Sequence, residues 1–108
     1  MCKPRTTERF KLHTDPGHGW LQVPHKLLVT LLIAHKISSY SYMGRHYAYL
    51  EEDCDLALFV EAYERYHGFN PTIYEHYSED TYVRGLKRFD WHELYKELGC
   101  KTAYPTYG

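Results

Sequence analysis

The segment SSYSYMGRHYAYLEE, residues 38–52, constrains the fold more than any other part of the chain, because it predicts a β-hairpin. Two aromatic-rich stretches, residues 40–42 and 47–50, flank the sequence Met-Gly-Arg-His, in which Gly44 supplies the turn. The chain's own helices can cover only one face of a small hairpin, so the other face meets solvent or a partner. The sheet that contains this hairpin is therefore expected to keep one side available for contacts.

Periodic patterns predict helices and strands both before and after the hairpin in the sequence. Apolar residues recur at helical spacing in some segments, while other stretches, bounded by turn residues, are typical of strands. Asp53 or Asp55 can cap one helix, which stops at Gly68, and Asp90 with Glu93 forms a capping-box pattern. The expected order is strands at 9–15 and 20–23, a helix at 25–37, the hairpin, a helix at 56–68, a strand at 71–77, and helices at 79–89 and 90–99.

Strands and helices mix here without strict β-α-β alternation, which predicts an α+β fold. We expect a small, mostly antiparallel sheet with three to four helices packed on one face. The chain of 108 residues has the size of a single domain, expected to span residues 1–108. Residues 1–8 are expected to form a flexible polar arm, and residues 101–108 an irregular tail.

The charge balance argues against several classes of partner. Thirteen lysines and arginines stand against fourteen aspartates and glutamates, which gives a formal net charge of −1. The chain has no large excess of positive charge that would attract DNA or an anionic membrane, so we expect no direct binding to nucleic acid. The longest apolar run, residues 27–34, is too short for a membrane span, which needs ~20 residues.

The cysteines indicate a reducing compartment. Cys2, Cys54 and Cys100 are odd in number, far apart and without C-x-x-C spacing, which argues against a disulfide framework and against a zinc ribbon. Residues 1–10 contain no apolar segment typical of a secretory signal. We therefore expect free thiols in a cytoplasmic protein.

The loop HTDPGHGW, residues 13–20, carries the candidate metal ligands His13, Asp15 and His18. A tight turn could bring these nitrogen and oxygen donors together, and three protein ligands would leave a fourth position for water. The alternative is ordinary turn chemistry, because an aspartate before Pro-Gly accepts backbone N–H hydrogen bonds without any metal. We favour the turn interpretation and expect no cofactor.

The residues DPGHG, 15–19, resemble the zinc-binding start of N-acetylmuramoyl-L-alanine amidases, in which DPGHGG follows the first strand. The resemblance implies that His18 would be a zinc ligand. It covers only these residues, and Trp20 stands where the family has a second small residue. The catalytic domains of that family are also larger than this chain and exported. We interpret the similarity as coincidental.

Glu51, Glu52, Asp53 and Asp55 concentrate negative charge at the predicted junction between the hairpin and the next helix. Their oxygens suit a hard cation, or the arginines of a protein or nucleoprotein partner. Acidic residues at a helix N-terminus also have a purely structural explanation, since they interact favourably with the helix dipole. Cys54 lies among them, and the flanking acids oppose a nucleophilic thiolate.

Over most of its length the chain resembles a group of short phage- and prophage-associated proteins of unassigned function. The residues that carry this resemblance are HTDPGHGWLQVP at 13–24 and YLEEDCDLALF at 49–59. The resemblance implies a mobile-element context, in which small proteins commonly bind a host factor, including as inhibitors of host defence such as anti-CRISPR proteins. The bacterial host cytoplasm is then the expected location.

We therefore expect a non-enzymatic protein that binds a host or phage macromolecule, either a protein or a nucleoprotein. One alternative is a small metal-dependent hydrolase or nuclease that uses His13, Asp15 and His18, with Glu51 or Asp53. Another is a role limited to homo-oligomerisation. The expected contact surface consists of the hairpin tyrosines, the acidic rim beside them and Trp20: Tyr40, Tyr42, Tyr47, Tyr49, Glu51, Glu52, Asp53, Asp55 and Trp20.

Overall fold

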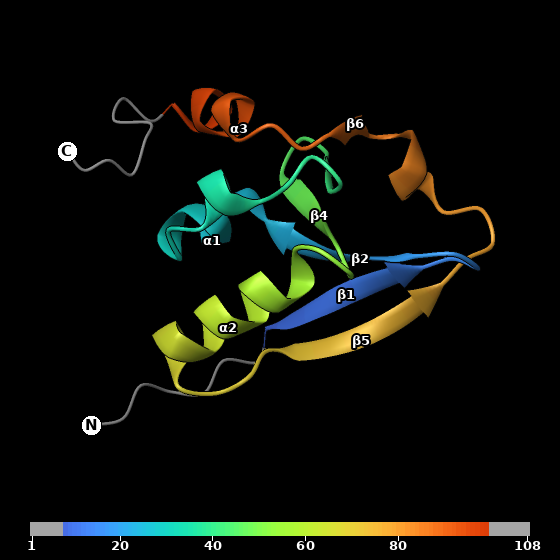
Figure 1. Ribbon diagram of the computed structural model, residues 1–108, viewed down its shortest axis with the longest axis horizontal. Helices are drawn as coiled ribbons and strands as arrows, with labels where there is room; N and C mark the ends of the chain where they lie inside the picture. Colours follow the sequence, from blue (N-terminus) through green and yellow to red (C-terminus); the bar gives the residue numbers. More distant parts are fainter. Residues whose placement is uncertain (1–7, 100–108) are drawn as a thin grey trace.

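The computed structural model describes residues 8–99, which build a six-stranded mixed sheet covered by helices (Figure 1). The strands lie in the order β5-β1-β2-β4-β3-β6. The pairing of β1 with β5 is parallel, and the other pairings are antiparallel. The predicted α+β class is confirmed, with the correction that the sheet is mixed. The strands are β1 (Arg9–Thr14), β2 (Gly19–Pro24), β3 (Tyr42–Met43), β4 (Tyr47–Glu51), β5 (Thr72–Tyr77) and β6 (Lys87–Arg88).

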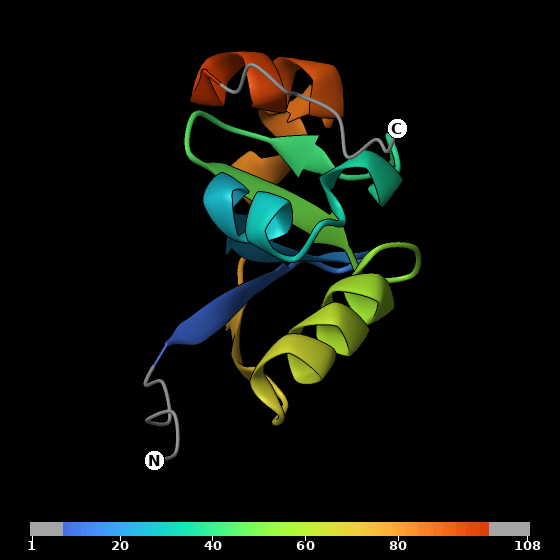
Figure 2. The same cartoon turned by 90° about the vertical axis from the view of Figure 1, so that its left-hand side faces the viewer.

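The helices pack on one side of this sheet (Figures 1 and 2). Phe10 of β1 meets Phe59 and Tyr63 edge-on, with ring centroids 5.2 and 5.6 Å apart. All three rings are almost fully buried, and burying a ring of this size stabilises a fold by about 2–3 kcal/mol. The helical elements are α1 (His25–Thr30), a 3-10 turn η1 (Ala34–Lys36), α2 (Leu56–His67), a second 3-10 turn η2 (Tyr82–Gly85) and α3 (Trp91–Leu98).

Two helices begin and end at the residues that the sequence indicates. α2 ends at Gly68, whose φ of 87° lies in the left-handed region that favours glycine. α3 follows Asp90, whose side chain accepts a hydrogen bond from the backbone N–H of His92, and it ends at Gly99 with a φ of 72°. Local chemistry therefore sets the ends of both helices and the start of α3.

The helix predicted over residues 25–37 is interrupted. α1 ends at Thr30, Leu32 takes a left-handed φ of 61°, and η1 follows. In a continuous helix, Leu31 and Ile33 would point roughly 200° apart, so that they could not both face the sheet. The break allows both to be buried and leaves Leu32 63% exposed. Packing of apolar neighbours overrides the helical pattern here.

The helix predicted over residues 79–89 is wrong, so three α-helices rather than four are found among residues 8–99. The segment instead forms η2 and the short strand β6. Val83 is buried on one face of the sheet, whereas Phe89 is buried in the helical core on the other face. A straight helix cannot reach both faces, so the segment wraps around the edge of the sheet.

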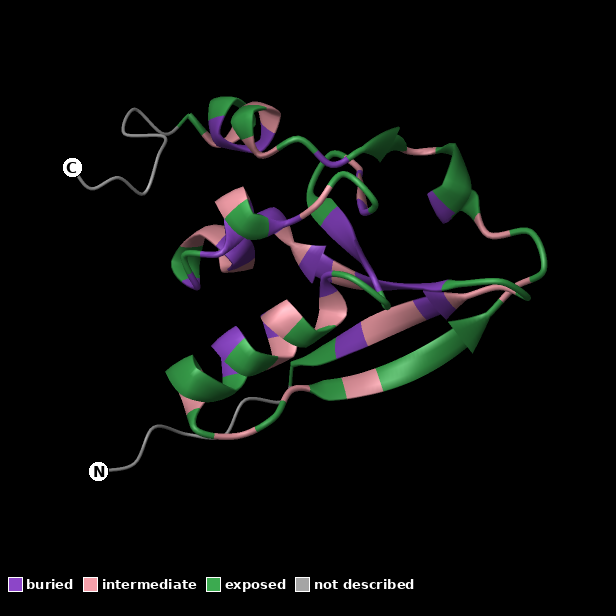
Figure 3. Cartoon of the chain, in the orientation of Figure 1, coloured by how far each residue is buried: buried purple, intermediate pink, exposed green. Residues whose placement is uncertain are grey.

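β5 forms the opposite edge of the sheet, and all of its residues except Ile73 are exposed (Figure 3). Ile73 packs against the helical core, while Tyr74 and His76 are exposed. Among the described residues β5 pairs only with β1, so it forms an edge of the sheet whose outer side is unpaired.

Several expectations fall on residues at the ends of the chain. The expected arm, apart from Glu8, and the expected tail at 101–108 lie outside the described residues, as do Cys2 and Cys100. Within residues 8–99, no helix has both the length and the apolar composition needed to cross a membrane.

Candidate functional site

The strands divide their side chains between the helical face and a second face of the sheet. Along β4, Ala48 and Leu50 belong to the helical core, so Tyr47 and Tyr49 point to the second face. Successive side chains of β4 therefore alternate between the two faces of the sheet. Any contact surface offered by the hairpin tyrosines must therefore lie on the second face.

Part of the second face is covered by η2 and the residue that follows it. Val83 and Leu86 pack over Trp20 and Tyr49, and the hydroxyl oxygens of Tyr49 and Tyr82 lie 2.9 Å apart. Burial, followed by the contact with Tyr82, raises the pKa of Tyr49. Trp20 and Tyr49 are only 2% and 5% exposed. Both rings pack inside the fold, so neither belongs to the exposed aromatic surface that the sequence predicts.

The other hairpin tyrosines do not form one exposed patch. Tyr40 is 64% exposed but precedes β3, Tyr47 is 40% exposed at the start of β4, and Tyr42 is half-buried against the cluster below η2. The four tyrosines therefore do not form the continuous exposed surface that the sequence predicts, because η2 and Leu86 cover Tyr49 and part of Tyr42.

The acidic residues after β4 divide into two exposed and two buried side chains. Glu52 and Asp53 are exposed, whereas Glu51 and Asp55 are 8% and 3% exposed. A continuous acidic rim of four carboxylates is therefore absent, and the expectation that Glu51 and Asp55 contact a partner's surface is not met.

Asp55 instead holds two loops together. Its carboxylate accepts hydrogen bonds from the backbone N–H of Ser38 and from the hydroxyls of Ser38 and Ser41. Ser41 Oγ in turn accepts a hydrogen bond from the backbone N–H of Glu51 at 2.9 Å. Asp55 occupies the N-cap position of α2, but its side chain makes no capping hydrogen bond. This network fixes the start of α2 against the segment before β3.

Cys54 is a free, exposed thiol. Desolvation raises its pKa, and the neighbouring carboxylates of Glu51, Asp55 and Asp53 raise it further. Because the thiolate is the reactive form, this environment disfavours nucleophilic chemistry, in agreement with the sequence argument.

Asp15 organises the loop between β1 and β2. Its Oδ1 accepts hydrogen bonds from the backbone N–H groups of Gly17 and His18 at 2.9 and 2.8 Å. The guanidinium of Arg84 donates to both carboxylate oxygens. The hydrogen bond from Arg84 holds the pKa of Asp15 well below its usual range. These contacts agree with the turn interpretation of DPGHG.

We expect Asp15→Asn to lower the free energy of unfolding by about 1–2 kcal/mol at neutral pH, because the charge-assisted hydrogen bonds with Arg84 are lost. A carboxyl group with a depressed folded-state pKa stabilises the fold above its unfolded pKa, near ~3.9, and this contribution is lost as the pH falls below that value. Urea unfolding at neutral pH and at about pH 3 measures the effect. The gap between wild type and Asp15→Asn should narrow at low pH, and a constant gap would contradict this role.

His13 lies on the second face of the sheet rather than in the turn. Its Nε2 is 2.7 Å from Gln22 Oε1, and its ring lies 5.3 Å from Tyr82 and 6.0 Å from His76, measured between centroids. Burial is the main cause of its lowered pKa. Among residues 8–99, the potential ligands that lie within 4.8 Å of one another are His18, Glu51 and Asp53, so the predicted set of His13, Asp15 and His18 is not assembled.

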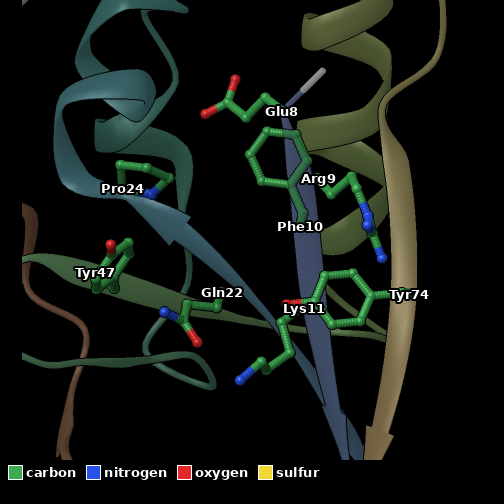
Figure 4. A pocket seen from close by; sticks show the side chains of 8 residues that line it. All are labelled: Glu8, Arg9, Phe10, Lys11, Gln22, Pro24, Tyr47 and Tyr74. Atoms are coloured by element: carbon green, nitrogen blue, oxygen red, sulfur yellow. The ribbon is translucent and has the colours of Figure 1, made fainter. Parts of the chain in front are cut away.

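The rest of the second face is uncovered. It runs over β5, β1 and the adjoining ends of β2 and β4, and forms a shallow hollow of about 290 Å³ (Figure 4). We call this surface the open half-face. Its exposed and half-buried side chains are Arg9, Lys11, Gln22, Tyr47, Tyr74 and His76.

The open half-face combines positive charge with exposed aromatic rings. The guanidinium of Arg9 lies 4.8 Å from the centroid of the Tyr74 ring. Neither Arg9 nor Lys11 forms an ion pair within residues 8–99. Tyr74 and Tyr47 are 38% and 40% exposed. These groups can accept a partner that supplies negative charge and apolar contact area.

Sequence reasoning did not identify the open half-face. Every second residue of a strand faces the same side of the sheet. On that basis the sequence already grouped Arg9, Lys11 and His13 on one side of β1, and Tyr74 and His76 on one side of β5. The missing information was the parallel pairing that places Lys11 beside Tyr74.

Comparisons with protein-family models, with curated proteins and with solved structures find no match to this chain.

Proposed function

We propose that this protein is a non-enzymatic binding protein whose open half-face contacts an acidic surface of a protein partner. The observation that carries the proposal is the placement of Arg9 and Lys11, two cations without an ion pair among the described residues, beside the exposed rings of Tyr47 and Tyr74. Arginine and tyrosine are enriched at protein interfaces relative to the rest of the surface.

The sign of the charge favours an acidic partner. Arg9 and Lys11 carry permanent positive charge, while Glu8 lies at the rim of the same hollow (Figure 4). Burial lowers the pKa of His13 beside them, which keeps that ring neutral. Complementary charge increases the association rate and excludes partners of like charge. The acidic rim suggested by the sequence would have favoured a basic partner instead.

A protein fits this surface better than a nucleic acid does. Binding to nucleic acid commonly uses several lysines or arginines that neutralise consecutive phosphates, and its affinity depends on their number. The open half-face offers Arg9 and Lys11 beside an acidic residue, in a chain with a formal net charge of −1. The resemblance of residues 13–24 and 49–59 to phage-associated proteins supports a host or phage protein in the host cytoplasm as the partner. Inhibition of host defence is the corresponding proposed outcome.

The proposal is tested by capture from nuclease-treated host lysate, followed by calorimetry with the purified captured protein. The double substitution Arg9→Glu/Lys11→Glu is expected to weaken binding on the order of 100-fold, and Tyr74→Ala about 10-fold. Both variants should keep the wild-type circular dichroism spectrum and thermal midpoint, because the side chains are not in the core.

Lys26→Glu and Lys36→Glu are matched controls, since both lysines are exposed on helical elements on the other side of the sheet. Binding to the captured protein should be the same for these controls as for wild type. Equal binding by the Arg9→Glu/Lys11→Glu variant would overturn the proposal. Capture that occurs from untreated lysate but not from nuclease-treated lysate would assign the surface to nucleic acid and would also overturn the proposal.

A further inference from the structure

Three potential metal ligands from separate segments meet at the end of β2 and β4 that lies away from the open half-face. His18 belongs to the loop before β2, Glu51 ends β4, and Asp53 lies in the turn before α2. One ligand atom of each lies within 4.8 Å of the others, and His18 Nδ1 is 3.6 Å from Glu51 Oε2. Ligand atoms around a tetrahedral zinc ion lie roughly 3.3–3.6 Å apart, given metal–ligand distances of about 2.0–2.2 Å. Small rotations of the exposed His18 and Asp53 side chains would reach that geometry.

Glu51 distinguishes this cluster from a group of surface acids. It is 8% exposed, yet within residues 8–99 no lysine or arginine pairs with it. Its Oε1 accepts a hydrogen bond from the backbone N–H of Asp53 at 3.0 Å, and Oε2 faces His18. A carboxylate removed from water needs compensating charge or hydrogen bonds. A cation held between Glu51, His18 and Asp53 would supply the missing charge.

Hydrogen bonds that involve no metal hold the backbone around the cluster in place. The backbone N–H of His18 donates to Asp15, which Arg84 holds in turn. The backbone N–H of Glu52 donates to the carbonyl oxygen of Gly19 at 2.9 Å, which joins the two ligand-bearing segments. A site of this kind loses little freedom when it binds a metal, because its supporting contacts already exist.

We propose that His18, Glu51 and Asp53 bind one divalent transition-metal ion, for which Zn²⁺ is the best match. Imidazole nitrogen selects zinc over magnesium and calcium, which prefer all-oxygen sites, and the two carboxylates complete a nitrogen–oxygen set that zinc accepts. Three protein ligands leave a fourth position for water or for a group from a partner. The ion would fasten the loop between β1 and β2 to the turn before α2.

Isothermal titration calorimetry with Zn²⁺ tests the site on the full chain. The background carries Cys2→Ser, Cys54→Ser and Cys100→Ser, so that thiols do not contribute, and the protein is first treated with chelator. We expect about one equivalent of Zn²⁺ to bind, with at least ~10-fold weaker binding in His18→Gln and in Asp53→Asn. Both side chains are exposed, so these variants should remain folded. An equal concentration of Mg²⁺ should give no binding heat.

Glu52→Gln and His76→Gln are the matched controls, because they remove an adjacent carboxylate and a separate exposed imidazole. Both should bind Zn²⁺ as the background protein does. Thermal denaturation provides a second measurement: Zn²⁺ should raise the midpoint of the background protein and of both controls, but not of Asp53→Asn. The proposal is overturned if Zn²⁺ does not bind, if His18→Gln and Asp53→Asn bind it unchanged, or if Mg²⁺ binds equally well.

Discussion

Asp55→Ala is expected to lower the free energy of unfolding by about 3 kcal/mol, the largest single effect of any substitution considered in this protein. The carboxylate is 3% exposed and accepts hydrogen bonds from Ser38 N, Ser38 Oγ and Ser41 Oγ. Alanine removes the acceptor and leaves three donors in a partly or fully buried site. Each unsatisfied buried donor costs about 1 kcal/mol or more. Urea denaturation at neutral pH measures the loss.

The matched control for this substitution is Asp53→Ala, two residues earlier in the same turn. The side chain of Asp53 is exposed. Only the backbone N–H of Asp53 donates a hydrogen bond to Glu51 Oε1, and the substitution leaves that group in place. The control should change stability by less than about 0.5 kcal/mol in metal-free buffer, as exposed substitutions generally do. Equal effects of the two substitutions would refute the structural role assigned to Asp55.

Mild acid is expected to destabilise the protein steeply, because two histidines are buried in their neutral form. His13 and His25 are each 2% exposed, and burial is the first cause of the lowered pKa of both. The Nε2 atom of His25 has no hydrogen-bond partner within residues 8–99, and burial outweighs the contact with Tyr47 and the charge of Glu97, which favour the protonated ring. Protonation of either ring therefore opposes folding.

The sign of this effect follows from linkage. As the pH falls through the unfolded-state pKa of histidine, near ~6.5, the unfolded chain binds protons that the folded protein does not bind. Stability is therefore greatest above that pH and declines below it, until the lowered folded-state pKa is reached. Each histidine contributes a slope of up to ~1.4 kcal/mol per pH unit, so the pair approaches roughly 3 kcal/mol per unit.

Urea unfolding curves collected between about pH 7.5 and pH 5 provide the measurement. His25→Gln and His13→Gln should each make the dependence on pH shallower, even where they lower stability at neutral pH. Lys36→Gln is the control, because Lys36 is exposed and its removal leaves every imidazole in place, and it should leave the slope unchanged. A wild-type stability that stays constant or rises on acidification would show that these rings do not oppose protonation.

The sequence by itself determined the elements whose signals are local. Gly68 and Gly99 end their helices, Asp90 caps α3, and Gly44 lies in the hairpin turn, since each requirement involves a few neighbouring residues. The alternation along β4 separates Ala48 and Leu50 from Tyr47 and Tyr49, but which of the two faces packs against the helices was decided by the tertiary structure. These features follow from backbone geometry and from side-chain periodicity, which any short segment contains.

Only the tertiary structure decided which surfaces are covered. Tyr49 is buried because the η2 segment, more than 30 residues further along the chain, packs over it, and Tyr82 of that segment forms a hydrogen bond with its hydroxyl. No local sequence pattern contains that contact. Likewise, Val83 and Phe89 look like one helical stripe but are buried on opposite faces of the sheet. Burial depends on what packs against a side chain, which is a property of distant segments.

The same reason explains why the sequence did not indicate the open half-face, and why it named His18, Glu51 and Asp53 only among a larger set of candidate ligands that also held His13 and Asp15. The open half-face exists because β5 pairs in parallel with β1 and brings Tyr74 beside Lys11, on the face of the sheet opposite the helices. The three ligands of the proposed metal site meet because antiparallel pairing of β2 with β4 sets Trp20 opposite Glu51, which places His18 next to that carboxylate. The sequence supplied the residue types, and strand register, which joins segments that are remote along the chain, determined which of them meet.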